Sequence, residues 1–150
     1  MQKRVHFTPQ GSNPLYEKFI NCIMKKGKKS VARRIFNDCL KMVGEKTKEE
    51  PTKVFTKALE NIKPQMEVKP KRIGGGVYQI PYEVSANRQI TLSFRWLIGA
   101  ARGNKAAPMY IKLANEIMQA AQGTGAAIKK RDETHKMAAA NKAFAHYARY

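Results

Sequence analysis

The stretch MEVKPKRIGGGVYQIPY, residues 66–82, departs from the helical pattern found elsewhere in the chain. Two extended runs, MEVKPKRI and VYQIPY, flank three glycines at 74–76, which is typical of a β-hairpin with a glycine tip. Pro70 and Pro81 cannot donate to a strand ladder, so both strands should be edges of a two-stranded arm at 65–82. Because an isolated hairpin is only marginally stable, we expect a surface outside the domain to support it.

Helical periodicity precedes and follows this arm. Caps, prolines and glycines place the expected helices at Pro14 to Gly27, Lys29 to Lys46, Pro51 to Pro64, Asn87 to Arg102, Pro108 to Gly123 and Ile128 to Tyr150. The apolar face of the second helix includes Val31, and Cys22 and Cys39 are assigned to the core. The sequence therefore predicts a mostly α fold, a six-helix bundle with a protruding two-stranded β-hairpin arm between the third and fourth helices.

Charge is the most informative part of the composition. The 150 residues include 29 Lys and Arg against 11 Asp and Glu, a net charge of +18. Such a domain usually has a polyanion as its partner, and nucleic acid is favoured over an anionic membrane surface.

No apolar run is long enough to span a bilayer, and the first ten residues lack the apolar core of a signal peptide. Two cysteines are too few for a disulfide scaffold, which indicates a reducing compartment.

The densest basic cluster is KKGKKSVARR, residues 25–34. No acid lies between Glu17 and Asp38, and Gly27 allows the chain to turn between two helices. We favour phosphate contact here over a merely solvated corner, because solvated surfaces normally mix both signs of charge. The candidate residues are Lys25, Lys26, Lys28, Lys29, Arg33 and Arg34.

Three arginines on the fourth expected helix, Arg88, Arg95 and Arg102, recur every seven residues. Residues seven apart share a helix face, so the three side chains should form a stripe roughly 21 Å long. No acid lies on this helix, so we favour binding to successive phosphates over an ordinary exposed face.

The hairpin combines basic residues with an aromatic ring. Lys69, Lys71 and Arg72 lie on its first strand, and Tyr78 on the second is expected to be free to stack on a base. The alternative is a mobile loop without a partner. The glycines lack the GK[ST] continuation of a phosphate-binding loop, so nucleotide hydrolysis is not expected.

Catalytic and metal-binding patterns are missing from the sequence. There is no GxSxG or HExxH motif, and His135 and His146 would lie about 16 Å apart along one helix, too far to share a metal. Asp132 and Glu133 stand beside cations and are interpreted as helix-start charges. We therefore expect no enzyme activity, no catalytic residues, no metal, no cofactor and no small-molecule substrate.

Five segments resemble the universal small-subunit ribosomal protein seven family in its bacterial or organellar form. They are GKKS (27–30), KPKRIGGGVYQIP (69–81), RWLIGAAR (95–102), LANEI (113–117) and KKRDETHKMAAANKAFAHY (129–147). The resemblance implies binding to the 3′ major (head) domain of small-subunit ribosomal RNA (rRNA), nucleation of head assembly, and a position near the E-site tRNA and the mRNA exit path. It also implies contacts with neighbouring small-subunit proteins.

Carried onto this chain, the resemblance adds Lys129, Lys130, Arg131, Lys136 and Lys142 to the rRNA contacts named above. It places Arg72, Gly74, Gly75, Gly76 and Tyr78 nearest tRNA and mRNA.

We expect residues 1–12 to be a basic extended arm and 13–150 a single helical RNA-binding domain that carries the hairpin. The expected location is the ribosome of a bacterium or organelle, with the short C-terminus slightly favouring the organelle. The alternative function is a free nucleic-acid-binding regulator, such as an mRNA-binding translational repressor.

Overall fold

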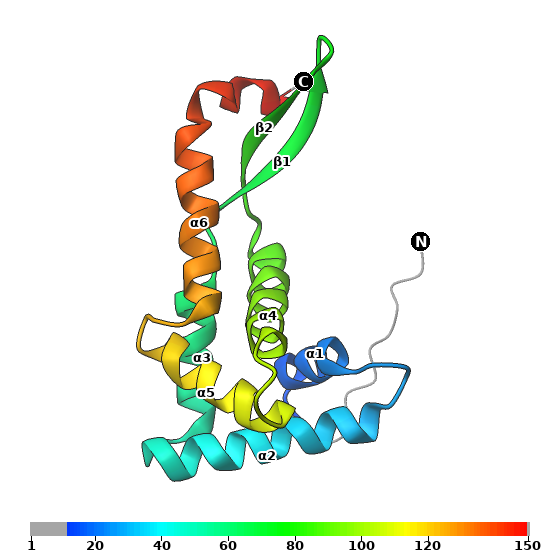
Figure 1. Cartoon of the computed structure of the whole chain (residues 1–150), viewed down its shortest axis with the longest axis vertical. Coiled ribbons are helices and arrows are strands. Elements are labelled where there is room, and N and C mark those ends of the chain that lie inside the picture. The colour runs from blue at the N-terminus through cyan, green and yellow to red at the C-terminus, as the bar shows by residue number, and fades with distance from the viewer. Residues whose placement is uncertain (1–11, 150) are drawn as a thin grey trace.

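The computed structural model describes residues 12–149, so the expected basic arm lies outside the described residues apart from Ser12. In chain order the elements are α1 (Pro14–Ile23), α2 (Lys29–Thr47), α3 (Pro51–Ile62), β1 (Met66–Ile73), β2 (Gly76–Glu83), α4 (Ala86–Gly103), α5 (Met109–Ala121), α6 (Ala126–Ala140) and a 3₁₀ helix, η1 (Lys142–Arg149). Helices α1 to α5 form a body at one end, and α6 and the hairpin extend together toward the other (Figure 1). The mostly helical fold with a hairpin between α3 and α4 is confirmed.

Local side-chain chemistry explains where the first helices begin. The Asn13 side chain accepts a hydrogen bond from the Leu15 N–H at 2.9 Å, and Pro14 occupies the first helical position of α1. Pro51 likewise occupies the first helical position of α3, where Glu50 makes no side-chain cap bond. Helix α1 ends at Ile23 rather than at Gly27, because Met24 already has an extended backbone.

Four phenylalanines, one from each of α1 to α4, form the centre of the body. The Phe19 ring meets Phe36, Phe55 and Phe94 edge to face, with centroids 5.3, 5.1 and 5.0 Å away. All four side chains are buried. A single aromatic cluster therefore joins helices that are far apart in the sequence.

Two of the expected core positions are wrong. The buried stripe of α2 follows Ala32, Phe36, Cys39 and Val43, a spacing of four, three and four residues. Val31 lies about 100° away from that stripe and is 44% exposed. Cys22 is also exposed, whereas Cys39 is buried as expected.

The hairpin has the expected two antiparallel strands, with Ile73 paired to Gly76 at the tip and Met66 paired to Glu83 at the base. Gly74 and Gly75 form the two-residue turn with φ values of +55° and +88°, a conformation that favours glycine. The hairpin is not isolated, which was the reason for expecting a support outside the domain: β1 packs against α6, and β2 packs against η1.

The C-terminal segment is not the single expected helix to Tyr150. Helix α6 ends at Ala140, where the Asn141 side-chain amide donates to the Met137 carbonyl at 2.8 Å. The Asn141 backbone N–H donates to the same carbonyl at 3.1 Å, and Asn141, with φ of −97° and ψ of 15°, is the residue after which the chain turns into η1. That turn brings η1 across to the hairpin (Figure 1).

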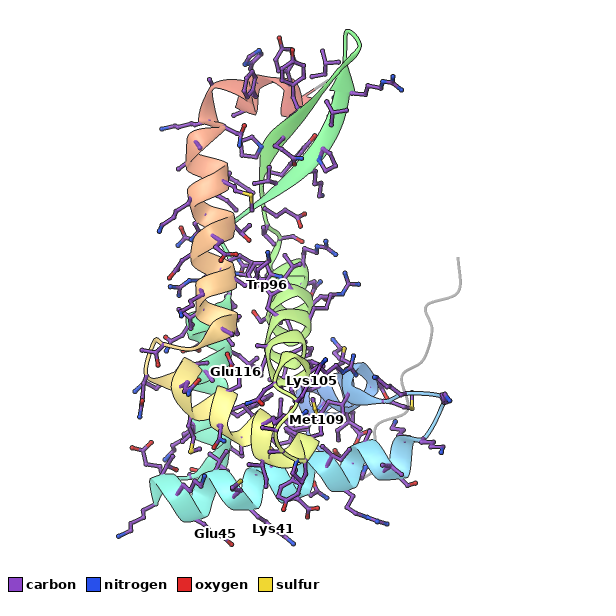
Figure 2. All side chains as sticks on the ribbon, viewed as in Figure 1. Lys41, Glu45, Trp96, Lys105, Met109 and Glu116 are labelled. Carbon is purple, nitrogen blue, oxygen red and sulfur yellow. The ribbon has the colours of Figure 1, made fainter. Side chains whose placement is uncertain are left out.

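A buried carboxylate joins α5 to α6. Glu116, on α5 in Figure 2, is 8% exposed, and its Oε1 accepts a hydrogen bond from the Ala127 N–H in the first turn of α6 at 2.8 Å. Gly125 precedes that turn with φ of +99°, and a Cβ there would lie 2.9 Å from the same oxygen. The LANEI segment thus supplies a cap for the next helix.

None of the helices in the described range is both long and apolar enough to cross a membrane.

Candidate nucleic-acid interface

The turn between α1 and α2 directs several lysines to solvent. Lys26 and Gly27 both have positive φ, 52° and 71°, so the chain reverses within two residues. Lys25, Lys26 and Lys28 are exposed on this corner, and Arg34 is exposed on the first turns of α2. Among the described residues none of these four has a carboxylate partner within ion-pair distance. This part of the predicted cluster is therefore available to an external anion.

The other two cations of the cluster are paired inside the chain, which corrects the expectation that no acid neutralises it. Lys29 Nζ and Arg33 Nη2 lie 3.1 and 3.0 Å from carboxylate oxygens of the buried Glu17. Burial alone raises the pKa of Glu17, but hydrogen bonds from Lys29, Ser12 and Arg33 hold that pKa below its ordinary value. The ionised carboxylate joins α1 to α2, so Lys29 and Arg33 also have a structural role.

Next to this corner lies a cleft of about 440 Å³ between α1, α2, the end of α4 and the start of α5. Four cations line it, Lys25, Lys28, Arg102 and Lys112, together with the apolar side chains Ile23, Met24, Val31, Ala32, Ile35 and Met109. No carboxylate is among these lining residues. The exposed Val31 thus belongs to an apolar floor that is surrounded by positive charge.

Two of those cations are held in place by backbone carbonyls. Arg102 Nη2 donates to the Ile23 carbonyl at the end of α1, at 3.1 Å, and Lys112 Nζ donates to the Asn104 carbonyl at 2.7 Å. Each bond uses only part of the side chain's donor capacity, so the remaining N–H groups can still meet a phosphate. Sequence reasoning missed Lys112, because a single lysine on α5 carries no local signal of its position beside the corner.

The predicted arginine stripe on α4 is divided between different roles. Arg88 Nη2 is 3.2 Å from the Glu67 carboxylate of β1, so an acid outside the helix neutralises it. Arg95 is exposed with no ion-pair partner in the described range, and Arg102 belongs to the cleft. The three arginines therefore do not form one free row of phosphate contacts.

Glu67 also holds the base of the arm. In addition to its ion pair with Arg88, its carboxylate lies 2.8 Å from Lys69 Nζ. Burial raises the pKa of this carboxyl, but Lys69 and Arg88 together hold that pKa below the ordinary value.

The other two cations of the arm differ from each other. Lys71 Nζ donates to the Tyr147 carbonyl of η1 at 3.1 Å, and Arg72 is exposed near the tip.

Tyr78 is not the free ring that the sequence predicts. Its ring packs against Phe144 of η1, with centroids 5.2 Å apart, and the residue is 38% exposed. One face of the ring is thus covered by the chain itself. The glycines of the tip, Gly74 and Gly75, are exposed and Gly76 is partly buried under the Tyr78 ring.

On α6, four of the five candidate cations are exposed: Lys129, Lys130, Lys136 and, just past its end, Lys142. Arg131 is different. It donates to the Asn61 carbonyl at the end of α3 and to Asp132 Oδ1, and so joins two helices. Asp132 lies in the middle of α6, so it is an ion-pair partner rather than a helix-start charge.

Comparison with known proteins supports the same class of partner. A family model described as "Ribosomal protein S7p/S5e" matches residues 1–142. The chain belongs to this ribosomal protein family. Members are structural RNA-binding proteins, so the chain is not an enzyme. The described residues also contain no group of three or more His, Cys, Asp and Glu side chains that could hold a metal ion.

Individual members of the S7p/S5e family match almost the whole chain. Small ribosomal subunit protein uS7 of Mycoplasma capricolum is 54% identical over 139 residues, 93% of this chain and 90% of the relative. The protein of the same name from Leptospira biflexa is 49% identical over 145 residues, 97% and 92% of the two chains. That of Magnetococcus marinus is 50% identical over 136 residues, 91% and 87%. These relatives are bacterial; they support a ribosomal location and give no support to the organellar preference.

Proposed function

We propose that the chain is a structural constituent of the small ribosomal subunit that binds the 3′ major domain of small-subunit rRNA. The observation that carries this proposal is the cleft beside the α1–α2 corner. It gathers Lys25, Lys28, Arg102 and Lys112 from segments far apart in the sequence, with no acid among its lining residues.

The physical mechanism is charge neutralisation on a rigid frame. Lysines at the corner replace condensed counterions on the RNA, and the release of those ions makes binding favourable and dependent on salt. The carbonyl bonds of Arg102 and Lys112 hold two of the cations in position before RNA arrives. Because several helices contribute, RNA segments distant in sequence can be held together, which is how such a protein would nucleate assembly of the subunit head.

The arm suits a second contact. It extends away from the body (Figure 1), and it presents Arg72, the glycine tip and the outer face of Tyr78. We assign this end to the E-site tRNA and the mRNA exit path, with neighbouring small-subunit proteins as further partners. Deleting Gly74–Gly76 should disturb handling of tRNA or mRNA and leave rRNA affinity largely intact. Loss of rRNA binding after this deletion would make the arm a main anchor instead.

Co-sedimentation with ribosomes in low and high salt tests the proposal against a free nucleic-acid-binding regulator. A permanent constituent of the subunit stays with the particle through a high-salt wash, because many contacts must break together. A regulator that binds an mRNA resembling the ribosomal site would leave the particle. Release of the chain in the wash, with retention on an mRNA, would replace the proposed function by the regulatory one.

A further inference from the structure

An aromatic surface forms at the far end of the molecule, where η1 meets the hairpin. It contains two ring pairs: Tyr78 with Phe144, at 5.2 Å between centroids, and His146 with Tyr147, at 3.9 Å. The hydrogen bond between this part of η1 and the hairpin uses the Tyr147 carbonyl, which accepts from Lys71 Nζ at 3.1 Å, and leaves the Tyr147 hydroxyl and ring out of that bond. His146 is exposed and Tyr147 is only partly buried.

The charge around these rings is of one sign. Residues 68–82 and 134–150 contain no Asp or Glu at all. Lys71 and Arg72 lie on the hairpin, and Lys142 begins η1. A contiguous group of exposed rings marks a binding surface, whereas a single exposed ring needs no partner, and here the partner must also tolerate concentrated positive charge.

We propose that the hairpin and η1 together form a stacking site for unpaired bases of single-stranded RNA. Aromatic rings stack on any base because every base has a π face, while adjacent cations follow the phosphate backbone. A protein partner would be expected to bring carboxylates and aliphatic side chains, whereas ring faces beside lysine and arginine match a base and its phosphate. A base paired in a duplex has no free face to offer, so the site selects unpaired strands.

This inference rests on the proposed role in RNA binding and names the residues that the arm end would use. It assigns a function to Phe144 and Tyr147, which the sequence analysis did not single out, and to His146, which the sequence analysis considered only as a metal ligand. It also explains why the 3₁₀ turn after Asn141 matters: a straight continuation of α6 would not bring these rings to the hairpin.

The test compares a single-stranded oligouridine RNA with inorganic polyphosphate of similar charge, which has no bases. The double variant His146→Leu/Tyr147→Leu removes two rings and retains the Tyr78–Phe144 contact. We expect its affinity for the oligonucleotide to fall between about fivefold and a hundredfold, with polyphosphate affinity unchanged. Tyr82→Leu is the matched control, because Tyr82 lies on the same arm but is paired with Glu67 near its base, and its ring contacts Lys69. This control should bind normally.

A second measurement covers the case in which the double variant loosens the arm. Oligouridine containing 4-thiouridine is cross-linked to the unmodified protein, and the attachment sites are mapped. Cross-links at Tyr78 or within 144–147 support the inference, and cross-links confined to other parts of the chain overturn it. Equal loss of oligouridine and polyphosphate affinity in the variant would also overturn it.

An rRNA head-domain fragment, measured in parallel, separates the two proposals. Failure of the wild-type chain to bind that fragment refutes the proposed function. Normal binding of the fragment, with oligouridine affinity unaffected in the double variant, refutes only the stacking site.

Discussion

Lys25 and Lys28 provide the sharpest check of the rRNA interface. Both are exposed at the cleft, and neither has an ion-pair partner in the described range. The double variant Lys25→Gln/Lys28→Gln should therefore fold normally and remove two phosphate contacts. Each contact contributes about 0.9 to the slope of log K against log salt, so the slope should become shallower by about 1.8.

That change in slope has a direct consequence for affinity. Between about 50 mM and about 200 mM salt, the deficit of the variant relative to the wild type should shrink roughly tenfold, because the variant has fewer counterions to release. A filter-binding titration with an rRNA 3′ major domain fragment measures both slopes.

The matched control is Lys41→Gln/Lys57→Gln, which removes the same charge from exposed positions on α2 and α3. Lys41 lies on the outer side of α2 (Figure 2), and neither Lys41 nor Lys57 lines the cleft. General attraction depends on net charge and falls equally in both variants, whereas specific contacts are lost only at the cleft. Equal slopes for the two double variants would refute the placement of RNA at the α1–α2 corner.

Two further predictions concern stability. Glu116→Ala removes the cap of α6 and leaves the Ala127 N–H without its partner. The free energy of unfolding, measured by urea titration, should therefore fall by about 1–3 kcal/mol. An unchanged midpoint of the titration would show that the cap is not stabilising. Glu17 and Glu67 have pKa values lowered from 4.5 in the folded chain. Their ion pairs therefore stabilise the fold above that pH, and stability should decline as the pH falls through the lowered folded values, because the unfolded state then binds more protons. The variant Glu17→Gln/Glu67→Gln should be less stable at neutral pH and show a weaker acid dependence; an acid dependence identical to that of the wild type would contradict this account.

Much of the fold could be predicted from local patterns. The glycine pair at the tip and the two prolines define a two-stranded hairpin, because glycine permits the positive φ that the turn needs and proline has no N–H to donate to a further strand. Helical periodicity located α1 to α5 to within a few residues. Periodicity does not predict the end of α6 at Ala140, because Asn141 gives no glycine or proline signal and its side-chain bond to the Met137 carbonyl is one of several that asparagine can make.

The candidate site was only partly predictable. Sequence alone identified a cationic, RNA-binding chain and the corner lysines, since an excess of positive charge persists in any fold. Which cations remain available depended on contacts between distant segments: Glu17 with Arg33, Glu67 with Arg88, and Arg102 with the Ile23 carbonyl. The cleft at Lys112 and the rings of η1 on the hairpin likewise arise only when helices pack. Packing decides these features because a charge or a ring acts through the neighbours within a few ångströms of it, and residues far apart in the chain become neighbours only in the folded state.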